Sequence, residues 1–412
     1  MKTSTLRFLC AALAASFVSA IPMNAQDAAV RGRVVYTMSG DPIFDAIVIV
    51  RAGKIAAIGP AAEIEIPAGL ELREAAVVTP GLIDAHTVVG LAGWLNHDHD
   101  QDQLERSAPV QPELRAIDAY NPREPLIAWV RGYGVTTIHT GHGPGAVISG
   151  QTMIAKTRGD TVAEALVRPY AMLAATLGRD ALGADRKPPG TRAKAVALLR
   201  SKLIEAQLYA EKKSAAAKDD EKEAPDRNLA KEALVEVLEG RVPLMITAQR
   251  ASDIEAALRL AKEFSLRLVL DGAAESYLLL EEIRKAEVPV ICHPPMFRAA
   301  GERENLSMQT PAKLKQAHIP LALQSGFESY VPKTRVVLFE AAIAAAYGMD
   351  FQDALGAITI DAARLLGIED RVGSLEVGKD GDLALYDGDP FEYTSHCIGV
   401  FIEGVLVSDE VR

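Results

Sequence analysis

Residues 77–91 read VVTPGLIDAHTVVGL, and this stretch decides how the rest of the chain is interpreted. Its apolar residues surround Asp84 and His86, which favours a short buried strand that delivers two chemically active side chains. The sequence before this stretch is rich in β-strand signals, and the sequence after it alternates strand and helix patterns. The stretch is therefore expected to open the main domain of the protein.

The two ends of the chain have the same β-rich texture. Near the N-terminus, AIVIVRAGKIAAIG has two apolar runs separated by residues 51–54, which is a hairpin signal. Near the C-terminus, GDLALYDGDPF and CIGVFIEGVLVSDE alternate short apolar runs with Gly and Asp turns. We expect residues 28–78 and 372–412 to form one composite small domain, a β-sandwich built from both chain ends, with the middle of the chain inserted between them.

The middle of the chain, residues 79–371, has the repeating strand–helix rhythm of an α/β protein. Helical spacing of apolar residues predicts helices over 252–263 and 275–285. A (β/α)8 barrel of the TIM type fits this rhythm best. The candidate strands are 82–86, 136–139, 244–248, 266–271, 288–292 and 319–324.

The first 25 residues are interpreted as an export signal. Lys2 and Arg7 precede an apolar run over 8–18, and small residues suitable for cleavage follow at 18–20 and again at 24–26. The protein is therefore expected to be periplasmic or secreted, with no membrane span after cleavage. An uncleaved anchor is the alternative, although the apolar run is short for a bilayer.

The net charge bears on nucleic-acid binding, and the cysteine content bears on disulfide formation. The formal net charge is −11, and no Lys/Arg-rich stripe offsets it, so nucleic acid is not expected as a partner. After removal of the signal, only Cys292 and Cys397 remain, and we expect both to be unpaired. A single disulfide between them is the alternative in an oxidising compartment.

Four features make the sequence resemble the amidohydrolase superfamily, in its imidazolonepropionase-like branch. They are the signal-like start, GKIAAIGPAAEI at 53–64, VVTPGLIDAH at 77–86, and DALGAITIDAARLLGIEDRVGSLEVGKDGDLALYDGDPF at 353–391. The last is the most specific, because it joins the expected final barrel helix to the returning β segment. The resemblance implies hydrolysis of non-peptide C–N bonds by water bound to one or two divalent metal ions, which lower the pKa of that water to about 7.

The metal ligands that the resemblance implies are mostly replaced in this chain. His86 matches the first ligand, but Val88, Thr247 and Gly272 stand where the family has histidine, and Ser325 stands where it has aspartate. The region 167–178, where binuclear members have a lysine ligand, contains none. A catalytic zinc needs at least three protein ligands, so no metal cofactor is expected. Zinc or another divalent metal is expected only if the site has been rebuilt from other residues.

Other polar residues could form a substitute site. NHDHDQDQLE, residues 96–105, contains His97 and His99 among carboxylates, which suits either a metal site or a solvated loop. His139 and His142 lie in IHTGHGPGAVISGQ, at the expected carboxyl end of a strand, where barrel proteins place function. They either line a pocket or satisfy nearby carbonyl groups.

Four further residues complete the candidate pocket, and each is expected near the carboxyl end of a strand: Gln249, Asp271, His293 and Ser325. Asp271 and His293 are either pocket residues or ordinary turn residues. His86, His139 and His293 could also converge on a different metal, although nothing in their spacing requires it.

Two functions remain open from the sequence. One is an exported hydrolase of non-peptide C–N bonds with a rebuilt or metal-free site. The other is a catalytically inactive pseudoenzyme that binds a small molecule, or that acts as the partner subunit of an active amidohydrolase. A homo-oligomer fits either function.

Overall fold

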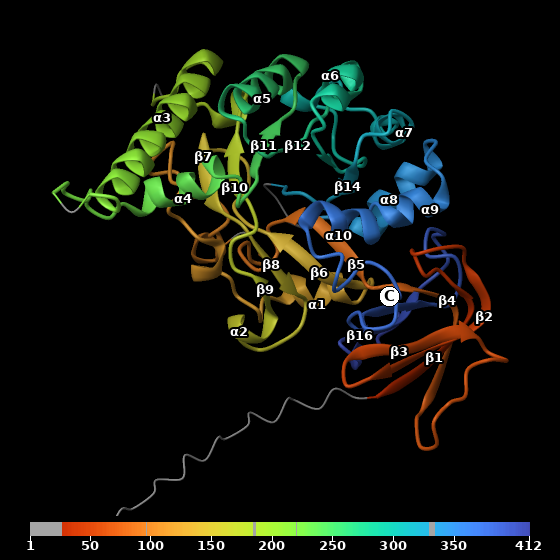
Figure 1. The fold of residues 1–412 in the computed structure, drawn as a ribbon. Coiled ribbons are helices and arrows are strands. Elements are labelled where there is room, and N and C mark those ends of the chain that lie inside the picture. The colour runs from red at the N-terminus through yellow and green to blue at the C-terminus, as the bar shows by residue number, and fades with distance from the viewer. Residues whose placement is uncertain (1–26, 96, 184–186, 220, 329–333) are drawn as a thin grey trace, which may run out of the picture.

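The computed structural model describes residues 27–95, 97–183, 187–219, 221–328 and 334–412 (Figure 1). The predicted signal segment, residues 1–25, lies outside the described residues. In the described part of the chain, no helix combines the length and apolar character needed to cross a membrane.

Both ends of the chain contribute to one seven-stranded sheet, with strand order β17-β16-β15-β4-β1-β2-β3. The predicted hairpin is confirmed, because β2 and β3 pair antiparallel with Arg51 opposite Lys54. The two chain ends meet where β15 pairs antiparallel with β4. The bounds are β1 Ala28–Val35, β2 Ile43–Arg51, β3 Lys54–Pro60, β4 Leu72–Pro80, β15 Leu383–Tyr386, β16 Cys397–Ile402 and β17 Val405–Ser408.

The expected two-sheet β-sandwich is a single sheet in the described residues. One face of the sheet buries a cluster that includes Val48 and Phe401. On the other face, Ile47 and Ile49 pack against partly buried apolar residues between β3 and β4, including Ile64. A loop covers this second face, so no second sheet is needed to remove its apolar side chains from water.

The middle of the chain forms two further sheets. One has six strands in the order β14-β13-β12-β11-β10-β7, and the other has four in the order β5-β6-β8-β9. Strands β10 to β14 run parallel, so their carboxyl ends lie at one edge. The bounds are β5 Leu82–Thr87, β6 Val135–Thr140, β7 Ile148–Gln151, β8 Met153–Lys156, β9 Leu166–Arg168, β10 Leu173–Thr176, β11 Leu244–Ala248, β12 Leu268–Gly272, β13 Val290–Cys292 and β14 Leu321–Leu323.

A closed (β/α)8 barrel is not seen among the described residues. The chain passes from β7 directly to β8 at Thr152, without a helix, and thereby changes sheet. Both strands pair antiparallel with a neighbour, β7 with β10 and β8 with β6. At the other edge, β14 and β5 approach through one parallel bridge between Thr87 and Gly326. The observed architecture is therefore a mixed α/β fold with two open sheets in the middle.

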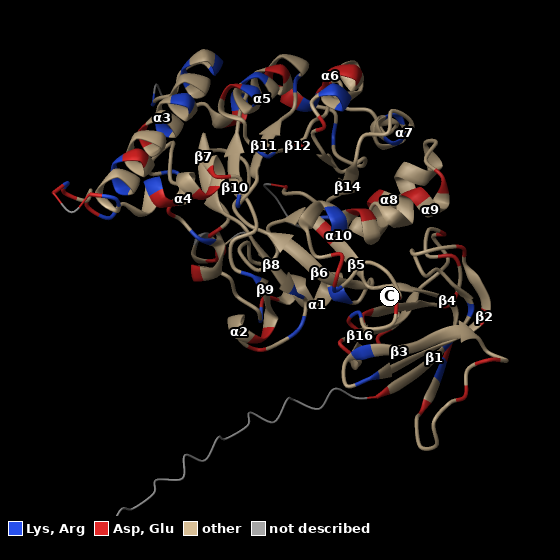
Figure 2. Cartoon of the chain, viewed as in Figure 1, with Lys and Arg blue, Asp and Glu red and all other residues tan. Residues whose placement is uncertain are grey.

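Helices cover the outer faces of these sheets, and α3 to α7 lie along the six-stranded sheet, away from the seven-stranded one (Figure 1). Residues of both charges are interspersed along α3, α5 and α6 (Figure 2). The helices are α1 Pro125–Arg131, α2 Val162–Ala165, α3 Arg192–Ala216, α4 Leu229–Leu238, α5 Ala251–Phe264, α6 Leu280–Lys285, α7 Thr310–Gln316, α8 Val337–Ala346, α9 Phe351–Gly356 and α10 Ile360–Leu366.

The helix predicted over 252–263 is confirmed as α5, whose Ile254, Ala257 and Leu260 are buried at helical spacing. The helix predicted over 275–285 is divided, because a 3-10 turn at Ser276–Leu278 precedes α6.

A buried ionic cluster joins the seven-stranded sheet to the middle of the chain. The ammonium group of Lys156, on β8, lies 3.1 Å from Asp380 and 2.5 Å from Asp382, just before β15. All three side chains are nearly inaccessible to solvent. Lys54 and Arg371 add further contacts to Asp380, so this carboxylate is surrounded by three cations.

Candidate functional site

The parallel strands bring several of the predicted residues together at their carboxyl ends. His86 lies on β5, and Asp271 lies on β12. Gln249 and His293 follow β11 and β13 directly. All four line one cavity. The structure therefore brings these four of the candidate pocket residues together.

The centre of the site is a buried pair of His86 and Asp271. The Nδ1 atom of His86 lies 2.8 Å from Oδ1 of Asp271. Thr247 Oγ1 donates to the other carboxylate oxygen at 2.6 Å, and Gln324 Nε2 donates to Oδ1 at 2.9 Å. His86 is 4% exposed and Asp271 is 2% exposed, so water does not compete for these bonds. Asp271 is therefore a fully bonded carboxylate in the core of the site rather than a turn residue.

The opposite charges of His86 and Asp271 shift each other's pKa. Burial alone would lower the pKa of His86, but the charge of Asp271 and the hydrogen bond to it outweigh burial and raise that pKa above its usual value. Burial would likewise raise the pKa of Asp271. The charge of His86 and the hydrogen bonds from His86, Thr247 and Gln324 outweigh burial and lower that pKa. Both shifts favour the charged forms, an imidazolium at His86 and a carboxylate at Asp271.

The cavity beside this pair is small. Its volume is about 20 Å³, which is room for one water molecule, since a water needs at least about 10–15 Å³. The Nε2 atoms of His86 and His293 are buried and have no hydrogen-bond partner among the described residues. His293 uses Nδ1 toward the carbonyl of Pro294 at 3.1 Å, and burial lowers its pKa to about 4.

These two imidazoles therefore offer opposite hydrogen-bonding groups. A neutral His293 that donates through Nδ1 carries a lone pair on Nε2, whereas a charged His86 carries N–H at Nε2.

Ser325 belongs to a separate buried network and does not line this cavity. Its backbone N–H donates to Asp84 Oδ1 at 2.9 Å, and its hydroxyl makes a short hydrogen bond to Asp84 Oδ2. The same hydroxyl contacts Thr334 Oγ1 at 2.6 Å and Thr87 Oγ1 at 3.0 Å. Burial raises the pKa of Asp84 to about 7. This network holds β5 against the end of β14.

His139 and His142 do not line the cavity. The ring of His139 lies 5.7 Å from that of His86, between centroids, but both of its nitrogens are bonded, to the carbonyl of Ala85 and to Thr152 Oγ1, each at 2.6 Å. Of the two alternatives for His139, satisfaction of nearby groups is the one observed. His142 is buried without a described partner, and burial lowers its pKa to about 4.

The polar loop after β5 places His97 and His99 at the surface. Their rings stack with centroids 5.4 Å apart, and His99 Nε2 lies 3.9 Å from Asp100. Asn96 lies outside the described residues. Within the ranges that the structure describes, no group of three or more His, Cys, Asp or Glu side chains could hold a metal ion, here or elsewhere.

The residues at the carboxyl ends do not fit the metal centre that the resemblance implies. Val88 has no ligand atom and lines the cavity with an apolar wall. Both oxygens of Asp271 are bonded to neutral donors as well as to His86. The resemblance matches Gly272 to a histidine ligand, but the structure shows that the side chain of Asp271 faces His86. Gly272 has φ of 73°, and a Cβ there would lie 2.5 Å from Gln249 Nε2.

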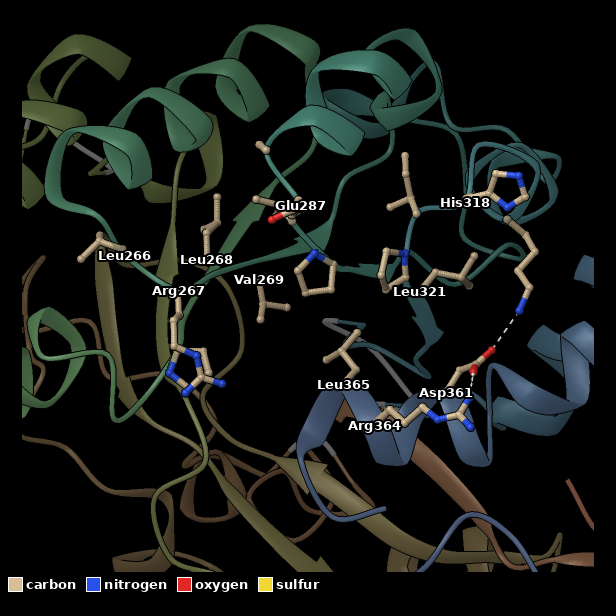
Figure 3. Close-up of a pocket in the computed structure, with 17 residues that line it drawn as sticks. Leu266, Arg267, Leu268, Val269, Glu287, His318, Leu321, Asp361, Arg364 and Leu365 are labelled. Atoms are coloured by element: carbon tan, nitrogen blue, oxygen red, sulfur yellow. Dashed lines mark hydrogen bonds and ion pairs between the residues drawn. The ribbon is translucent and has the colours of Figure 1, made fainter. Parts of the chain in front are cut away.

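A larger cavity, of about 800 Å³, lies at the opposite, amino ends of the same strands (Figure 3). Leu268 and Leu321, the first residues of β12 and β14, line it. Its acidic Asp361 is already paired, 3.0 Å from Lys315 and 3.2 Å from Arg364. This cavity contains none of the predicted site residues.

Several residues that line the cavity or bond to Asp271 are not predicted from the sequence. Phe297, Arg303 and Phe327 line the cavity, and Gln324 and Thr247 complete the hydrogen bonds of Asp271. The sequence marks Thr247 only as a residue at a position where the family has a histidine ligand. No sequence signal marks Phe297 or Arg303, because both lie in a non-repetitive connection after β13.

Comparison with known proteins places this geometry in a family. The model of the amidohydrolase family matches residues 328–407. The solved amidohydrolase from Thermotoga maritima MSB8 is 30% identical, with a TM-score of 0.87 over 93% of this chain and 100% of that one.

Curated relatives point to the same group. Imidazolonepropionase from Rhizobium rhizogenes is 25% identical over 87% of this chain and 90% of its own length. Amidohydrolase tasK from Hapsidospora irregularis is 23% identical over 85% of this chain, and the chain spans only 38% of that protein's length. The chain belongs to the amidohydrolase superfamily, in its imidazolonepropionase-like branch.

Proposed function

We propose that this protein is a non-catalytic member of its family that binds a small molecule in the site of His86, Asp271 and His293. The observation that carries the proposal is the saturation of Asp271, which accepts bonds from His86, Thr247 and Gln324. Because neutral donors already bond both oxygens of this carboxylate, Asp271 is part of a fixed hydrogen-bond network and does not offer a free oxygen to a metal ion. Val88 and Gly272 supply no ligand atom that would complete a metal centre beside it.

Metal content and turnover test this proposal together. The purified protein should contain less than one divalent ion per ten chains, and N-acyl dipeptides and cyclic imides should survive prolonged incubation with it. The triple variant Val88→His, Thr247→His, Asp271→His should bind zinc, which provides a positive control for the metal assay. A stoichiometric ion in the unmodified protein, or turnover above that of a His86→Asn, His293→Gln control, would overturn the proposal.

Metal-free hydrolysis is a second candidate, and the two unpartnered Nε2 atoms favour it. Asp271 fixes Nδ1–H of His86, which leaves Nε2–H to donate to a developing oxyanion. His293 could accept a proton from a water held in the cavity, because its Nε2 lone pair is unbonded. Under this candidate His86→Asn and His293→Gln each abolish turnover, whereas both variants are silent if the protein is non-catalytic.

We also propose that the protein is exported through its first 25 residues and acts in the periplasm or outside the cell. The support is the sequence pattern alone. Intact mass of the protein recovered from the periplasmic fraction would check it, since cleavage should leave an N-terminus between residues 20 and 28. Full-length protein in the cytoplasm would contradict this part of the proposal.

The domain organisation is proposed as a composite β domain, 28–78 and 372–412, around a barrel-type domain, 79–371. The bridge between Thr87 and Gly326 supports a barrel-like approach of β5 to β14. A partner subunit from the same family, or self-association, is compatible with this arrangement. Size-exclusion chromatography with light scattering, alone and mixed with an active homologue, would detect either assembly.

A further inference from the structure

The cavity at the amino ends of β12 to β14 has mainly apolar walls (Figure 3). Leu268 and Leu321 lie on strands and Leu365 lies on α10, so the sheet edge and one helix bound the space. Its volume of about 800 Å³ is within the range of small-molecule sites, roughly 300–1,000 Å³. Such walls favour a ligand with an apolar group to bury.

Three polar side chains line this cavity in one row across the sheet edge. β12 pairs with β13 so that Leu270 lies opposite Val290, and β13 pairs with β14 so that Val290 lies opposite Leu321. The members of the row each stand three residues before one of these paired positions, and they are Arg267, Glu287 and His318. Neighbouring strands are about 4.8 Å apart, so successive members of the row are within reach of one small ligand.

Two members of the row have backbone conformations that favour glycine. Glu287 has φ of 54° and His318 has φ of 57°, and each ends a helix, α6 or α7, whose last turn is closed by a hydrogen bond from the next N–H to a carbonyl five residues earlier. Ser265, after α5, has the same conformation, with φ of 55°. Glycine occupies the equivalent positions after α4, α8 and α10, at Gly240, Gly348 and Gly367. Three consecutive helix ends along this edge therefore keep a side chain at a cost in backbone strain, which is a feature of functional sites.

Two opposite charges of the row have no ionic partner. The acidic Asp361 of the cavity is already paired with two cations. The guanidinium group of Arg267 donates one hydrogen bond, at 2.9 Å, to the carbonyl of Gly240, which leaves most of its five N–H donors for a ligand. Within the ranges that the structure describes, neither Arg267 nor Glu287 forms an ion pair, and both side chains are exposed.

We propose that this cavity binds an apolar α-amino acid, whose carboxylate pairs with Arg267, whose ammonium group pairs with Glu287, and whose side chain packs against Leu268 and Leu321. An anion alone would lie beside the carboxylate of Glu287, and a cation alone would lie beside Arg267. A ligand that carries both charges on one carbon atom complements neighbouring positions of the row. This site is at the opposite strand ends from His86, so it is additional to the proposed function.

Calorimetry with three related compounds tests the ligand class. Phenylalanine carries both charges, 3-phenylpropanoate lacks the ammonium group, and 2-phenylethylamine lacks the carboxylate. Phenylalanine should bind at least tenfold more tightly than either of the other two. Equal affinities, or no binding of phenylalanine at millimolar concentration, would overturn the proposal.

Substitutions in the row test the role of each charge. Arg267→Gln should weaken phenylalanine at least tenfold and leave 2-phenylethylamine unchanged. Glu287→Gln should weaken phenylalanine at least tenfold without weakening 3-phenylpropanoate. Arg200→Gln and Glu281→Gln make the same charge changes at exposed positions outside the cavity and should bind phenylalanine as the unmodified protein does. Equal effects in the row and in these controls would overturn the assignment.

Histidine labelling tests the location of the ligand. Diethyl pyrocarbonate modifies accessible imidazole, and peptide mass spectrometry reports each site separately. Saturating phenylalanine should slow labelling of His318 at least threefold relative to His99, whose side chain is 78% exposed. His293→Gln alters the other cavity and should leave phenylalanine binding unchanged. Unprotected His318, or loss of binding in His293→Gln, would place the ligand elsewhere and overturn the proposal.

Glu287→Gly separates the function of the side chain from its effect on the fold. Glycine adopts a positive φ without strain, so the melting temperature should rise. The affinity for phenylalanine should fall at least tenfold, as in Glu287→Gln. A lower melting temperature, or an unchanged affinity, would contradict the inference that the carboxylate is kept there for a ligand.

Discussion

The Nδ1 atom of His86 lies 2.8 Å from Oδ1 of Asp271, although 185 residues separate them in the sequence. Each is at the carboxyl end of a different strand, in a different sheet. The pair therefore contributes a contact between the two middle sheets as well as a polar centre for the cavity.

Substitution of either His86 or Asp271 should destabilise the folded protein. We expect Asp271→Asn or His86→Asn to lower the free energy of unfolding by about 3–5 kcal/mol, because each leaves an uncompensated buried charge. Urea denaturation of both single variants and the double variant gives the coupling energy. The matched control is the exposed pair of His396 and Asp387, 3.0 Å apart, whose coupling should not exceed about 1 kcal/mol. Similar coupling in the two pairs would contradict the burial argument.

Gly272 should not tolerate a side chain. Gly272→Ala combines a positive φ of 73° with a clash against the side chain of Gln249. We expect a loss of about 2–4 kcal/mol in the free energy of unfolding, from backbone strain and overpacking together. Gly240→Ala has a similar φ of 71°, but its nearest atom would be 3.7 Å away, so it isolates the strain alone. An equal loss in both variants would show that the clash with Gln249 contributes nothing.

Glu340 should make stability depend on pH. It is fully buried, and burial raises its pKa to about 7. The folded protein then disfavours the charged form, so stability is highest below the pKa of the unfolded chain and falls as pH rises from about 4.5 to 7. Glu340→Gln keeps an acceptor for Met296 N–H and should remove about 2–3 kcal/mol of this loss, at about 1.4 kcal/mol per pKa unit.

Thermal or urea unfolding between pH 5 and 7.5 measures this difference. Some slope should persist in Glu340→Gln, because the pKa of Asp84 is also raised to about 7. Glu255→Gln, which alters an exposed ion pair with Arg259, serves as the control and should follow the unmodified protein. Parallel curves for all three proteins would contradict the prediction.

Lys156 should be essential to the contact between the seven-stranded sheet and the middle of the chain. Lys156→Met leaves Asp382 buried without its cation and should cost about 3–5 kcal/mol in the free energy of unfolding. Lys202→Met removes an exposed ion pair with Glu205 and should cost at most about 1 kcal/mol. Calorimetry compares the two, and equal losses would argue against a buried cluster at this contact.

Several elements could be predicted because their signals are local. The hairpin at 51–54, the strand carrying His86 and helix α5 each depend on residues that are neighbours in sequence. The common sheet of the two chain ends followed from their similar β-rich texture. The strands around 148–156 were not predicted, because β7 and β8 are four residues each and no helix separates them.

The candidate site was predicted less completely. His86, Gln249, Asp271 and His293 lie around one cavity, since carboxyl ends of parallel strands meet at one edge. The resemblance assigns the histidine-ligand position on this strand to Gly272. In the structure it is the adjacent residue, Asp271, whose side chain faces His86, and the sequence does not reveal which of the two faces inward. The bonded state of His139 and the roles of Phe297 and Arg303 depend on contacts between distant segments.

The sequence by itself determined the family and the strand-and-helix pattern of the middle, because these follow from residue type and local order. Only the tertiary structure decided that Asp271 is saturated by His86, Thr247 and Gln324, and that Phe297 lines the cavity. Hydrogen-bond saturation and ring packing are set by angstrom-scale distances between strands and loops that are far apart in the chain. Such distances leave no trace in residue spacing.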